Sequence, residues 1–426
     1  MTEIENPFKS FWMGGFECAD QLNVHGNRVD LLKDTGHLDI IDQDYEMISQ
    51  FDIRTVREGI RWSQVEYKPY QYDFSSVKQM ILAGQRNGTQ QIWDICHFGF
   101  PDDLTPLHPH FTPRFVALCK AFAFFYNHMA PESPLVVTPI NEVGFISWLG
   151  GDAAGTAPYC RNNGWEMKYA LMRAYIAGVK ALKEYDPRIR ILTTEPLINV
   201  VPEVGADETE IKSAQADHDL QYQAVDILCG KICPELGGKP EYLDMLGFNY
   251  YYNNQWVAGT HQYMGWNDPV MDTRWRSLSD LLREAHLRYD VPVVLTETSH
   301  PKEDRPIWIS MVAEESCKLV AEGIPLWGVC YYPIIDRPDW DQVDYWHNSG
   351  IWDTDPMVLG SSRVLHMPSA QALVAGQADL RNVQISAKNQ RTYKKKEKSS
   401  FAEYIIKLPG KIIKDFVSHA DDITAT

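Results

Sequence analysis

Eight short apolar segments alternate with stretches of helical periodicity along this chain, and this alternation constrains the fold more than any other feature. Most of the segments are apolar on both faces, which is typical of parallel strands covered by helices. They span residues 10–18, 55–62, 90–98, 135–142, 188–196, 245–252, 292–299 and 326–333. Helical patterns follow at 39–51, 75–87, 112–129, 164–185, 209–232, 278–289 and 306–322, with a last helix expected after residue 365. Because eight strand–helix units close into a barrel, the sequence predicts an α/β fold, a (β/α)8 TIM barrel with long βα loops.

The sequence after about residue 376 differs in composition from the barrel segments. It contains no strand pattern and carries the basic run Lys394-Lys395-Lys396. Runs of like charge are usually solvated segments rather than binding sites. We therefore predict a (β/α)8 barrel domain over residues 1–376 and a short basic C-terminal extension over 377–426, helical or partly disordered.

Charge and cysteine content exclude several classes of partner. With 40 Lys and Arg against 57 Asp and Glu, the net charge of −17 disfavours nucleic acid and anionic membranes. No apolar run approaches the ~20 residues of a membrane span, and the first residues lack a secretory signal, so we expect a cytoplasmic protein. The eight cysteines are scattered, and the close pair Cys229 and Cys233 has no histidine partner. We predict no metal and no cofactor; whether the chain forms a homo-oligomer stays open.

Polar residues close several of the predicted strands, where a barrel of this type places its active site. Two of them are carboxylates, Glu142 in the fourth strand and Glu297 in the seventh. Two carboxylates that face each other across a pocket can cleave a glycosidic bond, one as a protonated acid and one as an ionised nucleophile. Arg57 and a tyrosine from the sixth strand are expected to keep Glu297 ionised, whereas burial is expected to keep Glu142 protonated. Asn141 can reach the sugar 2-hydroxyl.

Other carboxylates near strand ends are ambiguous. Glu195 closes the fifth strand, and we interpret it as a supporting or substrate-contacting residue rather than a catalytic one. The same ambiguity applies to Glu17, Glu58 and Glu66, although alternation along the second strand places Glu58 opposite Arg57.

The motifs Asn141-Glu142, Asn249-Tyr250-Tyr251 and Thr296-Glu297, with a tryptophan in the eighth strand, resemble those of retaining β-glycosidases of the (β/α)8 clan. The chain is most similar to glycoside hydrolase family one, over roughly residues 10–360. This resemblance implies Glu142 as acid/base and Glu297 as nucleophile. The further roles that it implies are for sugar-binding or nucleophile-flanking residues: Gln21, Arg57, His97, Asn141, Asn249, Tyr251 and Trp327, the last as the sugar platform.

This chain departs from the family pattern at positions where the resemblance implies contacts to the sugar. The seventh strand continues Thr298-Ser299 instead of Asn-Gly, and no Glu-Trp pair follows the eighth strand. A loop with Asp336 and Trp340 stands there instead, and we expect both residues to contact the substrate. Because the loop also carries several carboxylates, binding of Ca²⁺ is an alternative role for it. The predicted function is therefore hydrolysis of small β-glycosides or oligosaccharides by a retaining mechanism. The alternative is a catalytically weak sugar-binding or regulatory barrel.

Overall fold

The computed structural model describes residues 5–260, 262–354 and 362–406, with 387–406 as helical backbone only. Parallel strands form one curled sheet in the order β7-β6-β5-β2-β1-β13-β12-β10-β8. Their bounds are β1 Trp12–Gly15, β2 Thr55–Gly59, β5 Gln90–Cys96, β6 Val136–Ile140, β7 Arg190–Ile191, β8 Glu195–Pro196, β10 Leu246–Asn249, β12 Val293–Thr298 and β13 Leu326–Tyr331.

The sheet closes into a barrel through the fifth predicted strand. Its two halves, β7 and β8, stand at opposite ends of the pairing order, yet only residues 192–194 separate them. Between them Leu192 bridges in parallel to Met245 and also donates its N–H to Val137. The predicted (β/α)8 barrel is thus confirmed, with each predicted strand segment containing an observed strand.

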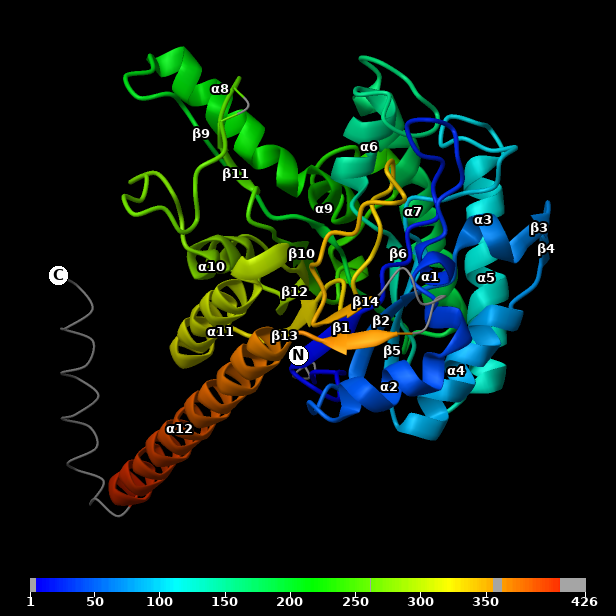
Figure 1. Cartoon of the computed structure of the whole chain (residues 1–426). Coiled ribbons are helices and arrows are strands. Elements are labelled where there is room, and N and C mark those ends of the chain that lie inside the picture. The colour runs from blue at the N-terminus through cyan, green and yellow to red at the C-terminus, as the bar shows by residue number, and fades with distance from the viewer. Residues whose placement is uncertain (1–4, 261, 355–361, 407–426) are drawn as a thin grey trace.

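Helices surround the barrel on its outer side (Figure 1). Their bounds are α1 Leu31–Asp34, α2 Ile41–Ser49, α3 Trp62–Val65, α4 Ser75–Asn87, α5 Phe111–Met129, α6 Val143–Gly151, α7 Gly164–Tyr185, α8 Glu208–Asp219, α9 Gln223–Leu228, α10 Leu278–Tyr289, α11 Arg305–Glu322 and α12 Met367–Ile406. The helix predicted at 209–232 is two helices, α8 and α9, joined by a short 3₁₀ turn. In the described part of the chain, no helix is both long enough and apolar enough to cross a membrane.

Three short two-stranded sheets, one parallel and two antiparallel, lie in the loops of the described chain. They are β3 Glu66–Lys68 with β4 Gln71–Tyr72, β9 Asn199–Val201 with β11 Gln255–Val257, and β14 Trp352–Thr354 with β15 Arg363–Leu365.

Two apolar layers hold the barrel. The larger lies between the strands and the surrounding helices. The smaller fills the barrel itself and contains Met13, Ile92, Val136, Leu192, Met245, Val294, Cys330 and Tyr332. Most of these side chains come from the first half of their strands, so they plug the amino-terminal end of the barrel. The carboxyl-terminal end is left for polar side chains.

The C-terminal helix α12 crosses the predicted domain boundary without a break and extends away from the barrel (Figure 1). Its first part packs on the barrel, where Ala370 and Leu373 are buried. Gly376 allows a close approach to α11, because an added Cβ would lie 2.6 Å from the Cβ of Ala313. The division at residue 376 stays a prediction, and residues 407–426 lie outside the described part.

Candidate active site

A cavity of about 360 Å³ opens at the carboxyl-terminal end of the barrel strands. Three carboxylates line it, from Glu17 after β1, Glu142 after β6 and Glu297 in β12. All three side chains are buried. Because buried carboxylates are costly unless they are paired or hydrogen-bonded, their partners decide their protonation states.

Glu297 is held between two donors. Arg57 Nη1 donates to its Oε1 at 2.6 Å, and the Tyr251 hydroxyl donates to its Oε2 at 2.7 Å. Both bonds favour the ionised carboxylate, and hydrogen bonds to a charged group are the strong ones. These two donors therefore fix the direction of both oxygens of Glu297.

Arg57 is itself fixed by a buried network. Its Nε and Nη2 donate to the two oxygens of Asp94 at 2.9 and 2.7 Å, and Nη2 also donates to Asn141 Oδ1 at 2.7 Å. Although burial opposes it, the Arg57 charge holds the pKa of Asp94 below its usual value. Asp94 also accepts from His97 Nδ1 at 2.7 Å, and this bond raises the pKa of His97 against the effect of burial.

Glu142 has the opposite environment. Burial is the main cause that raises the pKa of its carboxyl well above the usual value, followed by the negative charge of Glu297. Its one side-chain partner is Asn249, whose Nδ2 donates to Oε1 at 2.8 Å. Thr296 Oγ1 donates to Asn249 Oδ1 at 2.6 Å and so orients that amide. The cavity thus contains one carboxyl whose pKa burial raises and one carboxyl held by two strong donors.

Solved structures share this architecture. A β-glucosidase from Thermotoga maritima in complex with glucoimidazole matches with a TM-score of 0.69 at 14% identity, over 88% of this chain and 99% of that one. The β-glycosidase from the hyperthermophile Thermosphaera aggregans matches with a TM-score of 0.67 at 16% identity, over 82% and 88%. This chain has the fold of the family 1 β-glucosidases. No protein-family model and no curated protein sequence matches it. At such low identity the likeness shows the fold alone.

Within this β-glucosidase fold, most of the predicted site residues meet. The cavity lining includes His97, Glu142, Tyr251, Glu297 and Trp340, while contacts to these side chains bring in the others, which are Arg57, Asn141 and Asn249.

Three predicted contact residues lie outside the lining of this cavity. Trp327 stands at the start of β13 and packs against the apolar plug at the other end of the barrel. Asp336 is buried and accepts the Ser349 N–H at 3.0 Å, a bond within its own loop. Gln21 lines a neighbouring cavity of about 250 Å³, and Phe98 lines both this cavity and the one at the barrel mouth.

The ambiguous carboxylates are resolved by their partners. Glu58 faces away from the cavity and bonds His37 at 3.0 Å, as strand alternation predicts. Glu66 accepts from Arg114 Nε at 3.0 Å in the outer layer. Glu195 accepts the first two backbone N–H groups of α6, at 2.9 and 2.8 Å. Burial raises the pKa of Glu195 to about 7. Of these residues only Glu17 reaches the cavity.

Two lining residues were missed by sequence reasoning. Glu17 was left among the ambiguous acids, although its place just beyond the end of β1 matches that of the other site residues. Arg337 follows Asp336 in the predicted substrate loop, and it reaches the cavity where its neighbour does not. For both residues, the sequence offered only their position, at a strand end for Glu17 and in the predicted substrate loop for Arg337. Neither belongs to a motif that would have marked it as a site residue.

One group of potential metal ligands exists among the described residues, formed by Cys18, Asp94 and His97. Its donor chemistry does not suit a cation. Both oxygens of Asp94 already accept from the Arg57 guanidinium, and burial raises the pKa of the Cys18 thiol well above its usual value. A neutral thiol beside a fixed positive charge is a poor ligand.

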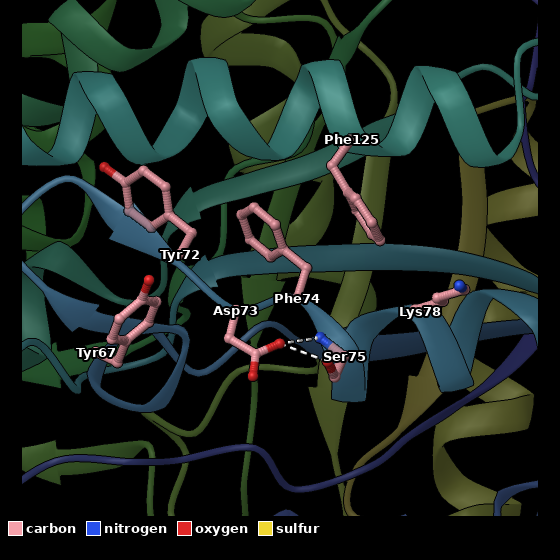
Figure 2. Close-up of a pocket in the computed structure, with 7 residues that line it drawn as sticks. All are labelled: Tyr67, Tyr72, Asp73, Phe74, Ser75, Lys78 and Phe125. Carbon is pink, nitrogen blue, oxygen red and sulfur yellow. Dashed lines mark hydrogen bonds between the residues drawn. The ribbon is translucent and has the colours of Figure 1, made fainter.

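A different cavity, of about 460 Å³, lies on the outer side of the barrel between the β3–β4 hairpin, α4 and α5. Figure 2 shows Tyr72, Phe74 and Phe125 gathered there, and the rings of Phe74 and Phe125 stack at 5.0 Å. Its lining holds a single carboxylate, Asp73, whose Oδ1 accepts from the Ser75 N–H and hydroxyl. This cavity therefore lacks the pair of facing carboxyls that lines the cavity at the barrel mouth.

Proposed function

We propose that this chain is a retaining β-glycosidase that hydrolyses small β-glycosides or oligosaccharides in the cytoplasm. The observation that carries the proposal is the pair Glu142 and Glu297, which share one cavity in opposite electrostatic environments. The fold shared with family 1 β-glucosidases supports it as analogy.

In the first step, Glu297 attacks the anomeric carbon while the Glu142 carboxyl protonates the leaving oxygen. The glycosidic bond breaks, and an ester between sugar and Glu297 forms. Arg57 and Tyr251 keep the attacking carboxylate ionised and aimed. Arg57 fixes Asn141 through Oδ1, and Nδ2 lies 3.2 Å from His97 Nε2. The second N–H of Nδ2 can donate to the 2-hydroxyl as positive charge develops on the ring.

In the second step, Glu142 becomes the base. Esterification removes the negative charge of Glu297, which is one of the causes that raise the pKa of Glu142. The Glu142 carboxylate then takes a proton from water, the water oxygen attacks the anomeric carbon, and Glu297 leaves as a carboxylate. Two displacements return the β configuration.

The test is hydrolysis of a panel of nitrophenyl β-glycosides by the wild type and by Glu142→Ala and Glu297→Ala. We expect the wild type to turn over at least one glycoside with retention, seen by NMR of the first product. Loss of the acid/base is expected to cost about 10²- to 10⁴-fold on substrates with poor leaving groups and far less on activated ones. Azide should then rescue Glu142→Ala to a β-glycosyl azide.

Glu297→Ala should give no β-azide; any azide product from it should be α-configured. Glu315→Ala is a matched control, because this buried carboxylate lies on α11 and bonds Ser279 and Lys318 away from the cavity. An inverted product, or azide products exchanged between the two variants, would refute the proposed roles. Sugar binding without hydrolysis would indicate a sugar-binding barrel instead.

A further inference from the structure

Glu195 is a buried carboxylate behind the candidate acid/base, and the two-step mechanism gives it no role. It begins the short strand β8, is only 3% exposed and is not among the residues that line the cavity. Its Oε1 accepts the N–H of Val143 at 2.9 Å, and its Oε2 accepts the N–H of Gly144 at 2.8 Å. These two residues open α6 immediately after Glu142. The carboxylate of Glu195 therefore bonds the backbone that carries the candidate acid/base.

The backbone of Glu142 needs such support. Its φ of 45° and ψ of 58° lie in the left-handed region, which residues other than glycine rarely adopt and which persists only where the surroundings impose it. Glu142 precedes α6 without capping that helix through its own side chain. Its N–H donates to the carbonyl of Thr194 at 2.8 Å, so three successive N–H groups bond Thr194 and Glu195. The left-handed turn is thus held by two neighbouring residues of the fifth strand segment.

Glu195 also places a negative charge near Glu142. Burial is the main cause that raises the pKa of Glu142, and the charges of Glu297 and Glu195 raise it further. The ester formed in the first step removes the charge of Glu297 but leaves that of Glu195. When Glu142 then acts as the base, the charge of Glu195 still favours uptake of a proton from water.

The groups around Glu195 balance its charge. Burial raises the pKa of its carboxyl to about 7, whereas the two N–H bonds and the positive charge of Lys168 favour the ionised form. Lys168 lies buried on α7 and donates from Nζ to Gln223 Oε1 at 2.8 Å. The 3₁₀ turn beside β8 contributes Tyr222, whose hydroxyl donates to Glu284 instead. Among the described residues, the titratable groups that face Glu195 from the surrounding elements are thus Glu142, Lys168 and Tyr175.

We infer that Glu195 is a positioning residue for Glu142: its carboxylate fixes the turn that carries the acid/base, and its charge sets the upper end of the pH range in which Glu142 can donate a proton. The inference rests on the proposed glycosidase function and adds a regulation of that same site from outside the cavity.

The first experiment measures kcat/KM for two aryl glycosides of the same sugar, one with an activated leaving group and one with a poor leaving group. An activated leaving group departs without a proton, so only the poor one needs a well-placed acid. Glu195→Ala should lower kcat/KM by about 10- to 100-fold for the poor leaving group and by less than about threefold for the activated one. A role for Glu195 in folding alone would lower both values alike.

The pH profile of kcat/KM tests the charge. Glu195→Gln keeps the size and one acceptor oxygen but removes the charge that raises the pKa of Glu142, so the alkaline limb should move down by about 0.5 pH unit or more. Glu315→Gln is the matched control, because this buried carboxylate also accepts a backbone N–H near the start of a helix, that of Ser279 in α10. It lies away from the cavity and should change neither the limb nor the ratio between the two glycosides.

Equal losses on both glycosides, or an alkaline limb of Glu195→Gln that stays in place or moves up, would overturn the inference while the proposed function stands. A wild type that hydrolyses no glycoside would refute both. If Glu195→Ala does not fold, Glu195→Asp, which keeps the charge but withdraws it by one methylene, decides by the same ratio between the two glycosides.

Discussion

His37 offers the sharpest test of the electrostatics behind the barrel wall. It is fully buried between two carboxylates, with Nδ1 2.7 Å from Asp44 Oδ2 and Nε2 3.0 Å from Glu58 Oε1. Burial lowers the pKa of the imidazole, but the two carboxylates outweigh it and raise the pKa to about 9. The other groups that face this cluster are Tyr45, which donates to Glu58, and Arg363, which donates to Asp44. The imidazole is therefore a cation at neutral pH.

The raised pKa of His37 predicts how much this residue contributes to folding stability and how that contribution changes with pH. A rise in pKa from about 6.5 to about 9 corresponds to about 3 kcal/mol of folding free energy. Because the folded pKa is above the unfolded one, this stability is fully present below pH 6.5 and lost as pH rises through 9. Linkage gives about 3 kcal/mol at pH 6, about 2 kcal/mol at pH 7.5 and less than about 1 kcal/mol at pH 9.

The perturbation is His37→Gln, measured by denaturant unfolding at these three pH values. We expect the stability difference between wild type and variant to be larger at pH 6 than at pH 9 by about 2.5 to 3 kcal/mol. His128→Gln, at an exposed position on α5, is the control and should show no such trend. A difference that stays constant from pH 6 to pH 9 would refute the reasoning, because it would mean that His37 is neutral in the folded protein.

Three further outcomes concern the active site and the C-terminal extension. Tyr251→Phe should lower kcat/KM for a nitrophenyl glycoside by about 10- to 100-fold, since it removes the 2.7 Å donor to Glu297; a change below twofold would contradict this. Asn249→Ala should move the alkaline limb of the pH profile of kcat/KM upward, because the Asn249 hydrogen bond lowers the pKa of Glu142; a downward shift would show the opposite coupling. Removal of residues 391–426 should leave kcat/KM within about twofold, since Gln377 and Leu380 already tie α12 to the barrel. Sedimentation of the truncated chain would expose any loss of an assembly.

The barrel was predictable because its signal is repeated. Most strand segments are apolar on both faces, and the helix bounds at 75–87, 164–185 and 278–289 coincide with α4, α7 and α10. Strand ends then located most of the site, since parallel strands bring their last residues to one mouth. The position of a residue within its strand was harder to predict. Trp327 lies in the expected strand, but it is the second residue of β13, so its ring lies at the amino-terminal end of the barrel and not at the mouth.

Sequence periodicity could not predict which residues far apart in the chain come into contact, and Glu17 shows why. The segment that carries it leaves β1 and crosses the end of β2, with Phe16 N–H bonded to the Arg57 carbonyl at 3.0 Å. Cys18 then lies so close to Gly59 that an added Cβ there would stand 2.5 Å from the Cys18 Cβ. A side chain at position 59 would displace Cys18, the neighbour of Glu17. The space for this segment therefore depends on a residue far from it in sequence, and nothing in the local pattern around Glu17 distinguishes it from the structural acids Glu58 and Glu66.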